Sequence, residues 1–118
     1  MLQAGDLRQR VSVEIKSKVS DGHDGYRADQ WAPIQSRIAA QVKPLAGRDL
    51  ERARQIDPRI SHEVTLRYWK AYRVDLNGGR SRLLYHDGPS NRPFEIVAPP
   101  VDVDEKHERL TVLCRESA

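Results

Sequence analysis

Cysteine is almost absent from this 118-residue chain: the single thiol, Cys114, has no second cysteine with which to form an internal disulfide. No apolar run approaches the ~20 residues that a membrane-spanning helix needs. Residues 1–6 show neither the basic nor the apolar region of a secretory signal, so we expect no secretion. Without an export signal, a reduced thiol in the cytosol is the simpler interpretation of the lone cysteine. We therefore expect a water-soluble globular protein with no membrane partner.

Potential metal ligands do not have the spacing of known sites. The four histidines are His23, His62, His86 and His107, and no two have the i,i+4 spacing of a helical zinc site. The acidic segment 102–108 fails as a twelve-residue calcium loop, because its sixth position is His107 and its twelfth is Leu113. A solvated turn is the favoured interpretation of that segment. We expect no metal and no cofactor.

Patterns that carry catalysis are missing as well. The turn-forming segment Asn77–Arg80 lacks the Lys-Ser/Thr of a phosphate-binding loop, and no serine lies in a nucleophile elbow. Cys114 falls on the apolar face of an expected strand, where cysteine packs as a small hydrophobic residue. The sequence therefore predicts no enzyme activity and no catalytic residue, and a small hydrolase or nuclease has no residue to support it.

The positive net charge of +3 is spread thinly. Residues 1–60 carry 11 Lys/Arg against 8 Asp/Glu, whereas residues 61–118 carry 9 of each. Only Arg48–Arg59 is locally basic, and nucleic-acid binders show a more concentrated excess. The segment Tyr68–Arg73 combines aromatic and basic residues that could stack on bases. Core packing or subunit contact is the favoured interpretation of these aromatic residues, but a small-barrel nucleic-acid-binding module remains the alternative function.

Alternation with a period of two predicts that most of the chain is β-strand. A turn region, Ser20–Asp29, follows the first strand, and Pro44 ends the second. Later strands are expected over residues 82–85, 94–98 and 110–114, the first two as a hairpin around Asp87-Gly88-Pro89. Inward-facing residues are expected to be Leu7, Val11, Val13 and Ile15, then Ile34, Ile38, Ala40 and Val42, then Ile60, His62, Val64, Leu66 and Tyr68. Because His62 shares its face with apolar residues, we expect it to be partly buried and hydrogen-bonded.

The period changes to three over Gly47–Ile56, where Leu50, Ala53 and Ile56 form a narrow apolar stripe. This pattern predicts one short helix, ended by Asp57-Pro58. Two or three turns are not stable alone, so the helix must pack on the sheet or on a neighbour. About six short strands and one helix predict a mainly β fold, a small β-barrel with the helix in an inserted loop, because closure removes exposed edges. We expect residues 1–118 to form a single domain.

The order of several short motifs is more specific than any one of them. They are Gly5-Asp6-Leu7-Arg8-Gln9-Arg10-Val11, Val42-Lys43-Pro44-Leu45-Ala46-Gly47-Arg48, His62-Glu63-Val64-Thr65-Leu66-Arg67-Tyr68, Phe94-Glu95-Ile96-Val97 and Leu110-Thr111-Val112-Leu113-Cys114-Arg115-Glu116. Over nearly the full length, the chain resembles the phage head–tail adaptor family, also called head-closure or stopper proteins. It departs from the family pattern in the longer, proline-rich segment Asp87–Phe94 and in Pro99-Pro100.

The resemblance implies a structural protein of the virion neck, made in the host bacterial cytoplasm. The implied partners are the adaptor ring beneath the portal, a tail-terminator or tail-tube protein, and copies of the same chain in a cyclic ring, expected to contain twelve subunits. Packaged double-stranded DNA would pass through the ring without sequence-specific contact. The family is not enzymatic, so no catalytic residue carries over.

The segment Pro44–Ser61 interrupts the alternating strands, so we expect it to project from the barrel. It would face the channel or the neighbouring subunit. The candidate contact residues are Arg48, Arg52, Arg54 and Arg59, which would act through charge and not by reading sequence. The alternative is a helix packed on the outer wall with solvated arginines.

Overall fold

The computed structural model describes residues 7–17 and 30–117, so the expectations for residues 1–6, the turn region Ser20–Asp29 and His23 lie outside the described residues. The elements are β1 (Gln9–Ser17), β2 (Gln30–Pro44), α1 (Gly47–Ile56), β3 (His62–Arg67), α2 (Tyr72–Asp75), β4 (Ser81–Asp87), β5 (Ser90–Ile96), β6 (Val101–Asp102), the 3-10 turn η2 (Val103–Glu105) and β7 (Arg109–Glu116). The described part of the chain is mainly β, and its longest helix, α1, has the bounds that the sequence predicted.

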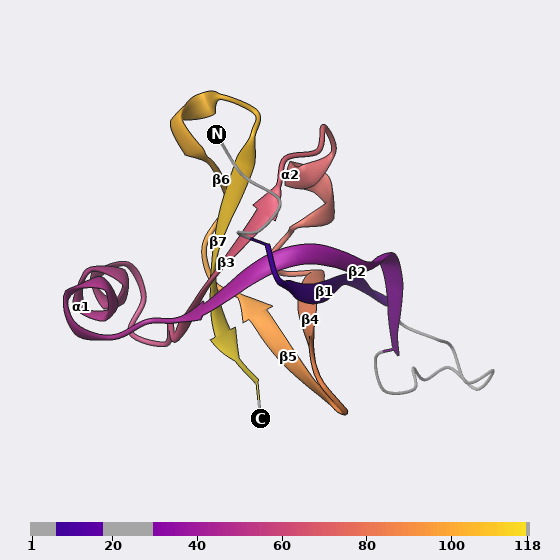
Figure 1. Cartoon of the computed structure of the whole chain (residues 1–118), viewed down its shortest axis with the longest axis horizontal. Helices are drawn as coiled ribbons and strands as arrows, with labels where there is room; N and C mark the ends of the chain where they lie inside the picture. The colour runs from indigo at the N-terminus through magenta and orange to yellow at the C-terminus, as the bar shows by residue number, and fades with distance from the viewer. Residues whose placement is uncertain (1–6, 18–29, 118) are drawn as a thin grey trace, which may run out of the picture.

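Antiparallel pairing joins the strands in the order β3-β2-β1-β4-β5-β7-β6. A further pairing, from His62–Cys114 to Arg67–Arg109, joins β3 to β7 and closes six of these strands into a barrel. The prediction of a closed β-barrel is confirmed, with β6 as one additional strand. Figure 1 shows the barrel at the centre of the molecule and α1 to its left, well separated from α2.

The second strand departs from regular alternation. Pairing of β1 with β2 shifts register twice between residues 11 and 14 of β1, and Arg37 has a left-handed φ of 51°. Ile34 lies between Gln35 and Pro33, which pair with successive residues of β1, so it is the extra residue of a β-bulge. Ile34 is 41% exposed, so the prediction that it faces the core is wrong. Ala40 and Val42, beyond the bulges, are buried as predicted.

The predicted hairpin is present, with a shorter loop than its sequence suggests. Asp87 pairs with Ser90, so only Gly88 and Pro89 connect β4 to β5, and Gly88 supplies the positive φ of 60° that the turn requires. β5 and β6 follow one another along the same edge of β7, with β5 against residues 114–116 and β6 against residues 110–111. Pro99-Pro100 separates them because proline cannot donate a ladder hydrogen bond.

The main core fills the barrel. Its buried members are Val11, Val13, Ala40, Val42, Val64, Leu66, Tyr72, Leu76, Leu83, Phe94, Ile96, Leu110, Val112 and Cys114. Cys114 is fully buried, as its place in the pattern predicted. His62 is partly buried and stacks on Phe94 with 4.7 Å between ring centroids. Its Nδ1 lies 2.8 Å from the Ser61 hydroxyl, which confirms the prediction of a packed, hydrogen-bonded histidine.

The buried thiol yields a first prediction. Burial raises the pKa of Cys114 far above its ordinary value, and only the thiolate reacts with disulfide reagents. We expect dithionitrobenzoate to modify the native protein more than about tenfold more slowly than the protein unfolded in guanidinium. The absorbance of the released thiol reagent at neutral pH measures both rates. Equal rates would show that the pairing of β3 with β7 opens readily.

His62 yields a second prediction, on pH. Burial lowers its pKa below the ordinary value of 6.5, so the folded protein resists a proton that the unfolded chain accepts. The contribution of His62 to the unfolding free energy should therefore be constant well above pH 6.5, fall as the pH drops through 6.5, and level off below the folded-state pKa. Urea titrations at a series of pH values would measure it. In the His62→Gln variant, the unfolding free energy should decrease less over this pH range. An unchanged decrease would show that other groups cause it.

Candidate channel and subunit-contact surface

The segment between β2 and β3 leaves the barrel and returns to it at neighbouring points. Pro44 pairs with His62, and the Leu45 N–H donates to the Ser61 carbonyl at 3.0 Å. Between these points α1 lies at one end of the molecule's long axis, in a structure that measures 51 × 31 × 29 Å (Figure 1). We call Pro44–Ser61 the α1 arm.

One face of α1 attaches the arm to the barrel. Ala53 is buried with Leu45 and Ile60 in a second small core, against which Leu50, Val97 and Leu113 pack. Ile56, predicted to complete this apolar stripe, is instead 66% exposed. A spacing of three residues rotates by about 60° per step around an α-helix, so the third member of the stripe is turned away from the surface that the first two contact.

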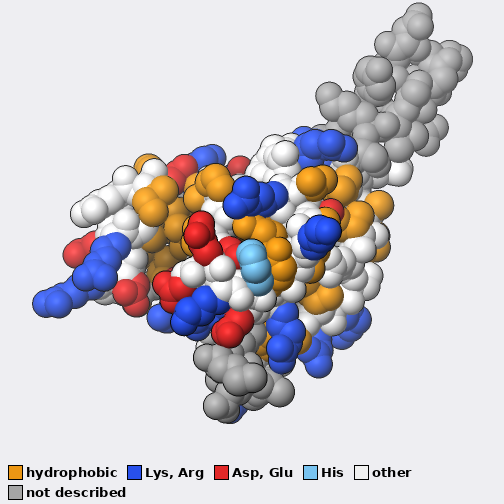
Figure 2. Space-filling model, turned by 90° about the horizontal axis from the view of Figure 1, so that it is seen from above, with side chains coloured by type: hydrophobic (Ala, Val, Ile, Leu, Met, Phe, Trp, Pro, Cys, Tyr) orange, Lys and Arg blue, Asp and Glu red, His pale blue; other side chains and the backbone are white. Residues whose placement is uncertain are grey.

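The remaining surface of α1 carries three arginines. Arg48, Arg52 and Arg54 are exposed, and their side chains form no hydrogen bond or ion pair with any residue that the structure describes. Nearby, Asp49 pairs with Lys43 at 3.5 Å. Figure 2 shows Lys and Arg side chains reaching furthest outward at this end of the molecule. The charge of the three arginines is therefore not neutralised by any residue that the structure describes.

Arg59 differs from the other three candidates. Its side chain donates to both carboxylate oxygens of Asp57, with Nε–Oδ1 at 3.1 Å and Nη2–Oδ2 at 2.9 Å. These hydrogen bonds raise the pKa of Arg59 and lower that of Asp57. The backbone N–H of Arg59 also donates to Asp57 Oδ1, at 2.8 Å. Arg59 is thus committed to contacts within the chain.

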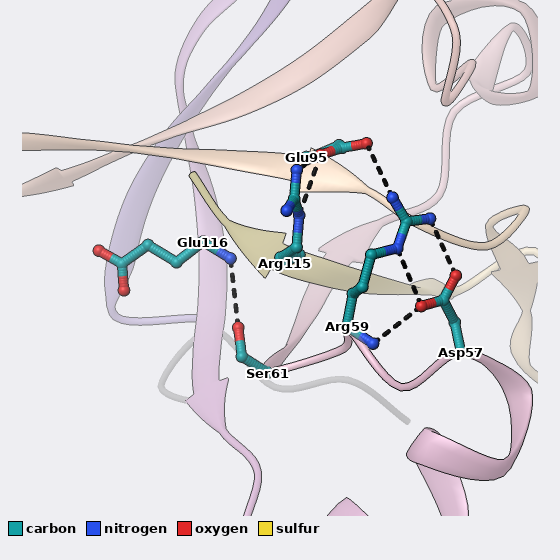
Figure 3. A network of polar contacts seen from close by, with 6 residues as sticks. All are labelled: Asp57, Arg59, Ser61, Glu95, Arg115 and Glu116. Atoms are coloured by element: carbon teal, nitrogen blue, oxygen red, sulfur yellow. Dashed lines mark hydrogen bonds and ion pairs between the residues drawn. The ribbon is translucent and has the colours of Figure 1, made fainter. Parts of the chain in front are cut away.

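Arg59 also links the arm to the barrel wall (Figure 3). Its Nη1 lies 3.8 Å from Glu95 Oε1 on β5, and the other oxygen of Glu95 accepts from Arg115 on β7. The structure therefore separates the four candidates into three arginines without a partner among the described residues and one arginine that anchors the arm. The sequence did not identify Glu95 and Arg115, whose pairing depends on the register of β5 against β7.

A second set of polar contacts joins β1 to β2 and to the β4–β5 hairpin, on the face of β1 that carries Ser12. Ser12 is buried, although it lies between Val11 and Val13, whose side chains face the barrel core. Its Oγ lies 2.7 Å from His86 Nε2 and accepts the Arg37 N–H at 3.0 Å. His86 Nδ1 is 3.0 Å from Asn91 Oδ1. The serine oxygen is already occupied and almost inaccessible, so this array holds the β2 bulge to the β4–β5 hairpin.

The aromatic residues of the Tyr68–Arg73 segment are used within the chain. Tyr72 lies in α2 and is buried in the main core. Tyr68 packs against His107 and Tyr72, with ring centroids 4.5 and 5.5 Å apart. The Trp69 indole N–H donates to Asp75 at 2.8 Å. This geometry favours the core interpretation over base stacking.

The acidic segment 102–108 is held in place by the side chain of Asp102, the last residue of β6. Asp102 accepts the His107 backbone N–H at 3.0 Å and lies 2.7 Å from His107 Nδ1, with its side chain only 7% exposed. Within residues 7–17 and 30–117, no group of three or more His, Cys, Asp or Glu side chains could hold a metal ion. None of the helices described there is long and apolar enough to cross a bilayer.

Comparisons with known proteins add to this geometry. The solution structure of protein SF1141 from Shigella flexneri 2a is similar, with a TM-score of 0.70 over 99% of this chain and 98% of that chain. At 24% sequence identity, this likeness shows the fold alone. Curated protein sequences give no match. The family model described as phage head completion protein matches residues 2–117. Because that match covers nearly the whole sequence, the chain belongs to the phage head completion protein family.

Proposed function

We propose that this protein is a structural subunit of the virion neck, which joins the DNA-filled head to the tail. It would bind beneath the portal-proximal adaptor ring, contact a tail-terminator or tail-tube protein, and form a cyclic ring of twelve copies. DNA would pass through the centre of this ring, which lines and can close the channel. Membership of a phage head completion family supports a structural role in the head or neck.

The observation that carries the proposal is an arm that is attached to the barrel and carries cations without a partner among the described residues. The α1 arm is fixed to the barrel by the Leu45–Ala53–Ile60 core and by Arg59. Arg48, Arg52 and Arg54 remain unpaired within the described structure. A few positive charges attract DNA phosphates or an acidic neighbour without reading sequence. Strong electrostatic attraction to the protein would hold back DNA that must later leave the head. A net charge of +3 is compatible with the passage of DNA through the ring.

The corresponding prediction concerns the three arginines together. In the triple variant Arg48→Glu, Arg52→Glu and Arg54→Glu, we expect normal folding, because none of these side chains has a partner within the described structure. Heads should package DNA and then lose it, or fail to accept tails. Particle yield, DNA content and electron microscopy of the particles measure this outcome.

The control for this experiment is Arg59→Glu, which places a carboxylate beside Asp57 and Glu95. It should lower the melting temperature of the purified protein, whereas the triple variant should leave it unchanged. If the triple variant yields infectious, DNA-filled particles at the original level, the arginines are only solvated and the proposed contact surface is wrong.

A further prediction concerns the isolated protein. The large hydrophobic side chains exposed in the described structure are Ile34, Ile56, Val74 and Val101, which lie on four different elements. Such scattered residues do not form the broad apolar patch of a stable homomeric interface. Analytical ultracentrifugation at micromolar concentration should therefore show a monomer or small oligomer. A stable ring formed by the protein alone would contradict this.

A further inference from the structure

The two bulges of β2 together displace its first half by two residues along β1. Val11 pairs with Ile38, and uninterrupted antiparallel pairing from there would bring Ile15 opposite Ile34. In the structure Ile15 instead pairs with Ala32. Because two is an even number, the part of β2 before the bulges keeps the same faces with either pairing. We call the observed pairing the bulged register and the uninterrupted one the regular register.

The bulged register places two residues of β2 unfavourably. Arg37 has a left-handed φ of 51°, which costs free energy in a residue other than glycine. Ile34 is 41% exposed. In the regular register Ile34 would lie opposite Ile15, on the face of β1 that points into the barrel, and Arg37 could adopt ordinary extended angles. Contacts that exist only in the bulged register must therefore offset these costs.

The first such contact is the hydrogen-bonded array around Ser12. The Arg37 N–H donates to Ser12 Oγ at 3.0 Å. Asn91 Oδ1 can only accept, so the neutral His86 ring carries its hydrogen on Nδ1, and its Nε2 accepts from the Ser12 hydroxyl at 2.7 Å. Each donor of the array then has one acceptor, around a serine that is only 4% exposed. The array forms only where the bulge frees the Arg37 N–H from the strand ladder.

The second contact is made by Trp31, before the bulges. The Arg82 guanidinium lies 4.3 Å from the centre of the Trp31 ring, within the range of a cation–π interaction. Arg82 is itself held by Glu14, to which its Nε donates at 2.8 Å. Trp31 reaches Arg82 because it pairs with Lys16 in the bulged register. In the regular register Pro33 would take that position, and Trp31 would lie about 7 Å further along the strand, away from Arg82.

We propose that β2 is a two-register strand, which the contacts of Ser12 and Trp31 hold in the bulged register. Loss of these contacts lets the first half of β2 move by two residues along β1, and this movement buries Ile34. The register therefore decides whether the surface of the barrel displays this isoleucine. A ligand that binds the exposed Ile34 acts on the same equilibrium and favours the bulged register. This inference does not depend on the proposed neck function.

Engineered cysteine pairs report the register. The bulged pair is Ile15→Cys with Ala32→Cys, and the regular pair is Ile15→Cys with Ile34→Cys. A disulfide needs Cβ atoms about 4 Å apart, whereas residues two positions out of register are about 7–8 Å apart. Each purified variant is equilibrated in a glutathione redox buffer, and mass spectrometry measures the ratio of disulfide to dithiol. Cys114 is buried and stays reduced.

Without further changes, the bulged pair should be mainly oxidised and the regular pair mainly reduced. Ser12→Ala removes the acceptor of the Arg37 N–H, so it should raise the disulfide ratio of the regular pair by about tenfold, the effect of one buried hydrogen bond. Trp31→Ala removes the contact with Arg82 and should raise the same ratio by about threefold. An unchanged ratio in either variant would overturn the proposal.

A third pair, Ile15→Cys with Gln30→Cys, is the control for general loosening of the strands. It lies two residues out of register in the opposite direction, so fraying of β2 favours it as much as the regular pair. A change to the regular register moves its two residues further apart. Ser12→Ala should therefore leave this control pair reduced. An equal rise in the control pair and the regular pair would show that Ser12 only stabilises the barrel, and the two-register strand would be wrong.

Discussion

The pairing of β3 with β7 is the interaction on which the rest of the structure depends. These strands are joined over six residue pairs, although more than forty residues separate them in sequence. The pairing leaves β3 between β2 and β7, and it lets the side chains of six strands fill one core. His62 and Cys114 form the pair at one end of this ladder, and both are packed against the core. Closure is thus also what shields the thiol and lowers the pKa of the histidine.

The same pairing of β3 with β7 positions the α1 arm. Beyond the paired strands, the Ser61 N–H donates to the Cys114 carbonyl and Leu45 donates to Ser61, so the ladder continues into the base of the arm. Arg59 then contacts Glu95, which is itself held by Arg115 of β7. The helix is attached through a small apolar core on one side and through this ionic array on the other. An arm held in this way presents Arg48 and Arg52 in a defined direction, which a flexible loop would not do.

Periodicity was sufficient to predict the closed β-barrel and the bounds of α1, because the change from period two to period three is sharp at Gly47 and ends at Ile56. It failed at Ile34, since a bulge inserts a residue without leaving a distinctive sequence signal. It also failed at Ile56, where a three-residue repeat drifts around the helix. The sequence could not predict that Arg59, unlike Arg48, Arg52 and Arg54, is paired within the chain. Its contact with Glu95 depends on the register between strands that are distant in sequence.

The attachment of the arm at two adjacent strands has an evolutionary consequence. Pro44 and His62 are register partners on adjacent strands of the barrel, so whatever joins them must span only the gap between paired strands, about 5 Å. The entropic cost of closing a loop between two such positions grows only slowly with the length of the loop. Insertions and exchanges between these two positions can therefore accumulate without disturbing the barrel. The surface that the arm presents can change at this position while the scaffold that holds it is inherited unaltered.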